Sequence, residues 1–371
     1  MLYIADYTRH ETKTGLAVCG DYSLCARLPH GTAYVLADGI GSGVYACVSA
    51  VVCAERVMEH IRLGTSPRAA SELAAASMHR ARTEDMPFAA FSAAMVLPDG
   101  AFTVYTYESP QPLLLKGGVA TALTPRVYAA GYEAVGECAG KLETGDSLLL
   151  MSDGVTQAGL GHGRGFGIGS PGVAEYINRH PAGDISRLPE SVAEYCACVS
   201  GGRHEDDTSL ALLHCREASE LTLLTGPPLN RALNGAYAQA LARAAGKKAV
   251  CGSTTIDIIS RELGVTAEPI ISKSAGAMPP EYALEGVDIA TEGAITLNRV
   301  CNILGEPPEE LQGNAYVLRL CRLLLEADVV HLHIGQAVND AHEGITFKLS
   351  GVRVRRAAVR SIAEKLRGMG K

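Results

Sequence analysis

The sequence predicts two successive domains, a mixed α+β domain over about residues 1–216 and a smaller α/β domain over residues 220–371. The chain has 371 residues, and one domain usually holds about 100–200 residues. Apolar residues make up 47% of the chain and charged residues 20%, so each domain can bury a core. Near residue 217 the expected elements change from grouped strands and helices to strands that alternate with helices.

Composition argues against nucleic-acid binding and against a membrane-spanning protein, and it predicts the cellular compartment. The formal net charge of −7 argues against nucleic-acid binding through overall basic charge. The four arginines in residues 352–360 are interpreted first as a solvated strand edge or helix face, and second as a binding patch. No stretch of about 18 uncharged apolar residues exists, so no membrane span is expected. The eleven cysteines form no CxxC pair and the N-terminus has no leader pattern, which predicts a reduced, cytoplasmic protein.

The first domain is expected to open with strands and then two helices. Apolar or alternating stretches predict strands over residues 2–6, 15–20 and 32–37. A helix over about residues 43–63 should follow, with one stripe formed by Val44, Val48, Val51, Met58 and Ile61. Ser66 before Pro67 is typical of a helix start, so a second helix is expected to about residue 82.

Strands return in the rest of this domain. Residues 97–100, Leu-Pro-Asp-Gly, predict a hairpin turn between strands 88–96 and 101–107. Further strands are expected over residues 112–116, 147–152 and 208–214, with helices over residues 172–179 and 186–199. The glycine-rich stretch 159–169 is expected to form either a mobile flap or an inert surface loop.

The second domain alternates strands with helices, which predicts a parallel sheet. The expected strands cover residues 221–224, 248–251, 287–290 and 329–334. The expected helices cover residues 233–245, 254–263, 295–304 and 317–327.

Four aspartates in the first domain stand beside apolar strands: Asp21, Asp38, Asp153 and Asp206. Each alone is more simply explained as a turn residue. Brought together, four carboxylates would repel one another unless cations lay among them. Their oxygens suit Mg²⁺ or Mn²⁺, and two such ions can activate a water and clamp phosphoryl oxygens. The set therefore indicates phosphate chemistry.

The motifs around these aspartates resemble those of the PPM-type (protein phosphatase 2C-like) family. Residues 20–43, GDYSLCARLPHGTAYVLADGIGSG, look closest to its bacterial sporulation-phosphatase (SpoIIE) branch. Residues 148–155, LLLMSDGV, resemble the third motif, and residues 206–210, DDTSL, resemble the last. Segments 88–96 and 107–115 look like the intervening strands, so the resemblance covers about residues 10–215. It implies a β-sandwich flanked by helices and a metal-dependent serine/threonine phosphatase.

The resemblance also implies a ligand set for two Mn²⁺ or Mg²⁺ ions. Asp21 and Asp38 would bind or bridge the metals with the Gly39 carbonyl, and Asp153 and Asp206 would complete the sites. Residues 208–209 are Thr-Ser where the family commonly has Met-Thr, and the loop 39–43 lacks the usual Met and Asn. No arginine can be assigned to the substrate phosphate. Arg164 and Arg203 are candidates, with solvated loop residues as the first interpretation.

The implied substrate is a bacterial regulatory phosphoprotein, such as an anti-sigma-factor antagonist. The family associates the helices over residues 43–82 with activation, so a partner or homodimer contact there could complete the metal site. The alternative function is a regulated signalling or scaffold module whose C-terminal domain senses a ligand. Separate chemistry in residues 220–371 is a third interpretation.

The second domain carries its own expected site, for a small anionic ligand. Polar, glycine-bearing loops follow four strands, and ligands of open α/β sheets bind at the carboxyl ends of strands. An anion could also accept hydrogen bonds from free N–H groups where a helix starts. The expected site comprises Gly252, Ser253, Thr254 and Thr255, with Gly226, Glu292 and Asn339 nearby. The simpler interpretation is that these loops only cap helices and that the domain serves for docking.

Overall fold

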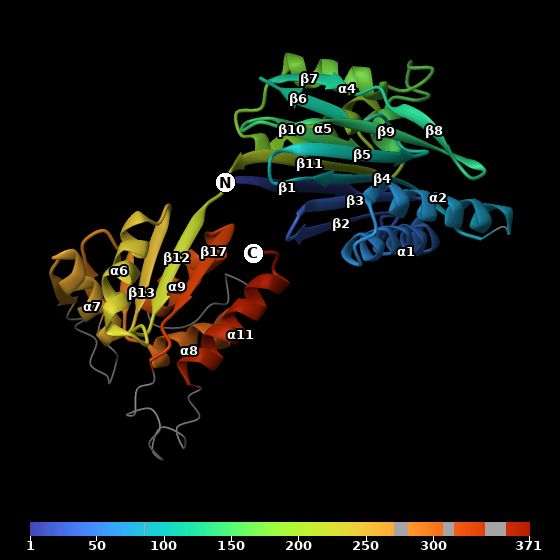
Figure 1. Ribbon diagram of the computed structural model, residues 1–371. Helices are drawn as coiled ribbons and strands as arrows, with labels where there is room; N and C mark the ends of the chain where they lie inside the picture. The colour runs from blue at the N-terminus through green and yellow to red at the C-terminus, as the bar shows by residue number, and fades with distance from the viewer. Residues whose placement is uncertain (85, 271–280, 307–314, 338–353) are drawn as a thin grey trace. The chain divides into compact units, whose positions relative to one another are not determined.

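The structure is a computed structural model that describes residues 1–84, 86–270, 281–306, 315–337 and 354–371. It divides into two compact units, Met1–Glu217 and Ala218–Lys371 (Figure 1). None of the helices in the described ranges has the length and apolar character needed to cross a lipid bilayer.

The first unit is a sandwich of two antiparallel sheets. One sheet has the order β1 (Leu2–Glu11), β11 (Thr208–Glu217), β10 (Ser147–Met151), β6 (Leu113–Lys116) and β7 (Val119–Ala122). The other has the order β2 (Asp21–Leu28), β3 (Gly31–Gly39), β4 (Ala89–Val96), β5 (Ala101–Tyr107), β9 (Glu133–Lys141) and β8 (Arg126–Ala130). Tyr34 and Leu36 of β3 point into the core between the sheets, while Val35 points to the opposite face, as strand alternation requires.

Helices cover both outer faces of this sandwich (Figure 1). On one side, α1 (Gly43–Arg62) and α2 (Pro67–Thr83) share a core with β3 and β4. On the other side, α4 (Gly169–Arg179) and α5 (Leu188–Val199) share a core with β10 and β11, near the short helices α3 (Asp153–Thr156) and η1 (Ile185–Arg187). Ser66 caps α2 by accepting a hydrogen bond from the Ala69 N–H, as its position before Pro67 predicts. The predicted α+β sandwich flanked by helices is confirmed.

Several local predictions for this unit were wrong. Residues 15–20 form turns, and Asp21 opens β2 instead of following a strand. Val44 and Val48 of α1 are exposed, because this helix buries small residues such as Ala46, Ser49 and Ala50 against the sheet. Strands β7, β8 and β9 were not predicted.

The second unit is a doubly wound α/β fold around one six-stranded sheet. The sheet has the order β14 (Ala267–Ile270), β15 (Glu281–Leu284), β16 (Ile289–Thr291), β13 (Lys247–Cys251), β12 (Glu220–Thr225) and β17 (Val329–Ile334). The last four strands pair in parallel, which confirms the predicted parallel sheet, and β14 and β15 extend it antiparallel. The chain reverses its direction of winding between β12 and β17, which is a topological switch point.

Two groups of helices cover the two faces of this sheet. One core includes residues of α6 (Asn234–Arg243), which follows η2 (Arg231–Leu233), and of α7 (Ser253–Leu263). The opposite core includes residues of α8 (Ala294–Ile303), α9 (Ala315–Glu326) and α11 (Arg355–Gly368), and Figure 1 shows α8 beside α11. Arg355, Arg356 and Arg360 of the C-terminal arginine run lie on α11. The interpretation as a solvated helix face describes the exposed Arg356 and Arg360, whereas Arg355 is half-buried.

Candidate metal centre

Strand pairing brings three of the four predicted aspartates together. In the antiparallel pair of β2 and β3, Asp21 lies opposite Asp38. Strand β10 ends at Met151, and Asp153 opens α3 immediately afterwards. The Asp153 N–H points to Oδ2 of Asp38 at 3.4 Å. The β2–β3 hairpin and a segment 115 residues after Asp38 thus meet at one end of the sandwich.

Asp21 is a buried carboxylate without a partner. It is 5% exposed, and neither of its oxygens accepts a hydrogen bond from any described residue. The hydroxyls of Ser152 and Ser209 are close enough to favour the ionised form of Asp21, but Ser152 Oγ donates to the Asp207 carbonyl and Ser209 Oγ is bonded to His10. A buried charge without a partner is strongly unfavourable, and a cation is the partner that would relieve it. The residues present therefore fit a bound metal.

The raised pKa values of the neighbouring aspartates also favour a site for cations. Burial, only partly opposed by nearby hydroxyls, raises the pKa of Asp21 to about 7. Burial and the neighbouring charges of Asp21 and Asp153 raise the pKa of Asp38 to about 10. Burial also raises the pKa of Asp206. Cations binding here would lower these pKa values, because they favour the ionised carboxylates.

The structure separates Asp206 from its neighbour Asp207. Asp207 is buried, and its two oxygens accept hydrogen bonds from the backbone N–H groups of Lys13 (2.9 Å) and Gly20 (2.8 Å). Asp207 therefore fixes the loop before β2. Asp206 is half-exposed, and its Oδ1 accepts a hydrogen bond from the Asp207 N–H at 3.0 Å and lies 3.8 Å from Lys13 Nζ, which leaves Oδ2 as the oxygen for a ligand.

Two glycines allow the elements of this centre to approach closely. A Cβ on Gly39 would lie 1.9 Å from the Ala46 carbonyl oxygen, so only glycine lets α1 pack beside the end of β3. A Cβ on Gly154 would lie 2.2 Å from the Asp207 carbonyl oxygen. The glycine after each of Asp38 and Asp153 thus has a packing reason. The Gly39 carbonyl remains a predicted metal ligand.

Side chains alone do not form a closed cage here. Across the residues that the structure describes, no group of three or more His, Cys, Asp or Glu side chains converges as a ready metal site. Hard divalent cations commonly complete their coordination with backbone carbonyls and water. The orphaned oxygens of Asp21 are the stronger indication, because a buried charge needs a partner even where the remaining ligands are not side chains.

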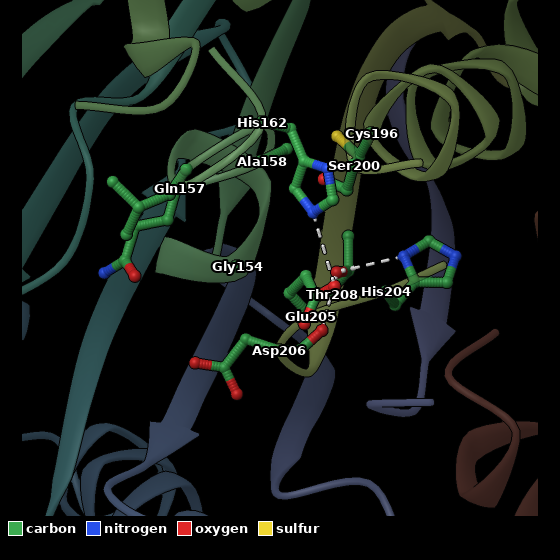
Figure 2. A pocket seen from close by; sticks show the side chains of 11 residues that line it. Gly154, Gln157, Ala158, His162, Cys196, Ser200, His204, Glu205, Asp206 and Thr208 are labelled. Atoms are coloured by element: carbon green, nitrogen blue, oxygen red, sulfur yellow. Dashed lines mark hydrogen bonds and ion pairs between the residues drawn. The ribbon is translucent and has the colours of Figure 1, made fainter. Parts of the chain in front are cut away.

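A pocket of about 250 Å³ adjoins the aspartates (Figure 2). Gly154 and Asp206 belong to its lining, which links it to the metal set. Figure 2 shows His162 directed toward Glu205, with 3.5 Å between His162 Nε2 and the Glu205 carboxylate, and His204 bonded to Thr208 at 3.2 Å. His162 and Leu160 come from the glycine-rich stretch, so this loop borders the candidate site, as the flap interpretation expects.

Sequence reasoning missed three side chains of this site and named two arginines that do not line it. His162, His204 and Gln157 line the pocket, and Gln157 Nε2 donates to Asp153 Oδ2 at 2.7 Å. The spacing of four residues between Asp153 and Gln157 could have revealed that contact. The lining contains neither Arg164 nor Arg203. Arg203 lies beside Glu205, with 3.5 Å between the charged groups.

The predicted ligand residues of the second unit share one edge of its sheet. Gly226, Gly252 and Glu292 each follow the last residue of β12, β13 and β16, and these strands are parallel neighbours. Ser253, Thr254 and Thr255 open α7 directly after Gly252. The predicted Asn339 lies outside the described residues.

The model of the family described as Stage II sporulation protein E (SpoIIE) matches residues 29–216, just over half of the chain. The chain belongs to the SpoIIE family. The resemblance drawn from the aspartate motifs is thereby confirmed, and SpoIIE membership supports protein serine/threonine phosphatase activity. No curated protein matches the sequence.

Three solved structures are similar to this chain at low sequence identity. The RsbU and RsbW domains of Rv1364c from Mycobacterium tuberculosis match with 17% identity and a TM-score of 0.50, over 64% of this chain and 68% of that chain. The PP2C phosphatase domain of SpoIIE from Bacillus subtilis, solved with a fragment of its regulatory domain, matches with 18% identity and a TM-score of 0.49, over 58% and 64%. RsbX in complex with magnesium matches with 15% identity and a TM-score of 0.42, over 57% and 100%.

Proposed function

We propose that the first unit hydrolyses phosphoserine or phosphothreonine on a regulatory phosphoprotein. Its two Mn²⁺ or Mg²⁺ ions would be held by Asp21, Asp38, Asp153, Asp206 and the Gly39 carbonyl. The observation that carries the proposal is the buried Asp21 carboxylate, whose oxygens have no partner among the described residues. When bound, two such ions supply an activated water and neutralise charge on the phosphoryl oxygens.

The chain's own residues position the ions and admit the substrate. Asp38 lies between Asp21 and Asp153, and Gln157 holds the Asp153 carboxylate through a 2.7 Å hydrogen bond. The phosphorylated side chain would enter the pocket that Asp206 borders. Because no arginine lines this pocket, His162 and His204 are the ring donors expected to meet phosphoryl oxygens, in exchange for their present contacts with Glu205 and Thr208.

The test is phosphate release by the full chain in the presence of Mn²⁺, from phosphorylated proteins and from p-nitrophenyl phosphate. Asp38→Asn and Asp153→Asn should each lower the rate at least about 100-fold, because metal affinity and the activated water are both lost. Asp99→Asn is the matched control, since Asp99 lies in the β4–β5 hairpin turn. If the wild-type chain with Mn²⁺ hydrolyses none of these substrates, the proposed activity is wrong.

A regulated signalling module remains the second candidate. It is favoured by the second unit, whose strand ends form a separate polar edge that the phosphatase chemistry does not use. For the phosphatase function, the proposed kind of substrate is an anti-sigma-factor antagonist. Turnover of a phosphoprotein separates the candidates, because a pure scaffold would bind the phosphoprotein and release no phosphate.

The outer face of α1 supports the expected partner or homodimer contact. Four apolar side chains of α1 are exposed, namely Val44, Tyr45, Val48 and Val52, and Ile40 in the loop before the helix is exposed as well. Helix α1 begins four residues after Gly39 and packs directly against it through Ala46. A contact that shifts α1 would therefore reach the metal ligands through the Gly39 backbone.

A further inference from the structure

Three of the four parallel strands of the second unit are followed by a glycine, and β16 is followed by Glu292. The strand register aligns Cys251 with Thr225 and Thr291, and Thr225 with Ile334. Gly252, Gly226 and Gly335 follow the aligned residues of β13, β12 and β17. Glycines leave the backbone at this edge open to close approach. Gly226 and Gly335 flank the topological switch point, where ligands of open α/β sheets bind.

Arg355 brings an uncompensated positive charge to this edge. Its guanidinium occupies the space above Gly226, where a Cβ would lie 2.2 Å from Cζ. Nη2 donates to the Gly335 carbonyl at 3.3 Å and the Ala337 carbonyl at 3.0 Å, while Nε is buried without a partner. Within the described ranges no carboxylate pairs with Arg355. The charged or titratable groups that act on it are Tyr237 and Arg356, and burial lowers its pKa.

Two helices begin at the same sheet edge, shortly after β13 and β16, without side-chain caps. Gly252 and Gly293 are the N-cap residues of α7 and α8, and neither helix start has a side-chain hydrogen bond. The two caps are in contact, because a Cβ on Gly293 would lie 3.3 Å from the Gly252 Cα. The starts of both helices therefore lie close together, and the free N–H groups of a helix start favour an anion together with the helix dipole.

Buried hydroxyls without partners mark the same place. Thr255 and Thr296 stand in the first turns of α7 and α8, and both are 0% exposed. Neither hydroxyl has a hydrogen-bond partner among the described residues. Thr255 Oγ1 lies 3.2 Å from the position of a Cβ on Gly252, so it is directed to the N-cap of α7. A buried hydroxyl without a partner is rare and calls for an explanation.

The geometry points to a binding site for the phosphate group of a small ligand, between Arg355 above Gly226 and the start of α7 at Gly252. Arginine and helix N–H groups are the donors that proteins use for phosphate. The loop after β12 carries Pro227 and Pro228, which have no N–H, so it cannot hold a phosphate as the first loop of a dinucleotide-binding fold does. The ligand class is inorganic phosphate or a small phosphomonoester such as a nucleoside monophosphate. This inference adds a charged residue to the expected anion site and does not depend on phosphatase activity.

The test measures binding to the full chain by calorimetry and by thermal unfolding. EDTA is present throughout, so that no divalent ion recruits phosphate to the first unit. The probes are inorganic phosphate, adenosine monophosphate and adenosine without phosphate.

Two variants probe the site from opposite sides. Arg355→Gln removes the positive charge. Ser253→Asp places a carboxylate at the first position of α7, which stabilises the helix start but repels a phosphate. Arg360→Gln on the same helix is the control, because Arg360 is exposed.

We expect phosphate or adenosine monophosphate to bind the wild-type chain and the Arg360→Gln control, and to raise their unfolding temperature. Both site variants should bind at least about tenfold more weakly, since each removes or opposes a charge-assisted contact. Without ligand, Ser253→Asp should unfold at no lower temperature than wild type, so its loss of binding cannot come from misfolding. Binding of adenosine monophosphate but not free phosphate would identify a nucleotide site. The inference is overturned if neither phosphate probe binds at about 10 mM, if adenosine binds equally well, or if Ser253→Asp binds like wild type.

Discussion

The buried carboxylate of Asp21 predicts that the metal-free protein loses stability as the pH rises. In the unfolded chain Asp21 has its ordinary pKa of 3.8, whereas burial raises its pKa to about 7 in the fold. The folded state therefore holds the proton over a pH range in which the unfolded state has lost it. Asp21 therefore lowers the free energy of unfolding as the pH rises from about 4 to about 7, and its own contribution levels off above that.

The magnitude follows from the window. Between pH 5 and pH 7 the folded state keeps a proton that the unfolded state has already lost. The free energy of unfolding therefore falls by about 1.36 kcal/mol per pH unit, or about 3 kcal/mol over two units. Asp21 is 5% exposed, so solvent screening removes little of this. Asp38, whose pKa is raised to about 10, acts in the same direction. A unit of about 200 residues shifts its unfolding temperature by about 2–4 °C per kcal/mol, so the expected difference is on the order of 10 °C.

The assay is calorimetric unfolding of the full chain at pH 5 and pH 7.5, with EDTA or with Mn²⁺. In EDTA the transition of the first unit should come at lower temperature at pH 7.5. Mn²⁺ should reverse this loss, because ions that bind only the folded state stabilise it. Asp21→Asn is isosteric and cannot ionise, so it should reduce the pH slope to the part that Asp38 contributes and raise the metal-free unfolding temperature at pH 7.5. The reasoning is refuted if the variant and the wild type show the same slope.

Two further predictions concern residues around the metal set. Asp207→Ala should destabilise the first unit by about 1–3 kcal/mol, because the N–H groups of Lys13 and Gly20 lose their acceptor; a denaturant titration with an unchanged midpoint would contradict the structural role of Asp207. Val48→Lys should weaken self-association or partner-stimulated turnover while leaving the unfolding temperature nearly unchanged, because Val48 is 56% exposed; sedimentation and phosphate-release measurements that match wild type would count against a contact on α1.

Local signals in the sequence predicted those elements that local interactions fix. The hairpin at residues 97–100 and the helix start at Ser66 were found because turn and cap chemistry lies within a few residues. The predicted strand over residues 15–20 failed for the opposite reason. The ends of that loop are held from far along the chain, since Thr14 bonds to His204 and Gly20 to Asp207. Apolar character alone could not show that these backbone groups were already engaged.

The error on α1 shows how packing distance can override side-chain hydrophobicity. A stripe of large apolar residues predicted Val44 and Val48 as buried. At its start the helix instead approaches the sheet so closely that Gly39 has no room for a Cβ beside Ala46. Only small side chains fit at that distance, so Ala46 and Ala50 are buried and the valines face outward. The same close approach couples α1 to the predicted metal ligands.

Adjacent residues of identical chemistry take different roles when the tertiary contacts around them differ. Asp206 and Asp207 could not be distinguished by charge, yet both oxygens of Asp207 turn inward to backbone donors, whereas Asp206 accepts one backbone hydrogen bond through Oδ1 and keeps Oδ2 for a ligand. The C-terminal arginines behave in the same way. A solvated helix face describes the exposed Arg360, but Arg355 is drawn over the sheet edge because Gly226, far earlier in the chain, has no side chain there. A sequence pattern can therefore identify which residues form a site. The orientation of each side chain depends on contacts with residues that are distant in the chain and near only in the fold.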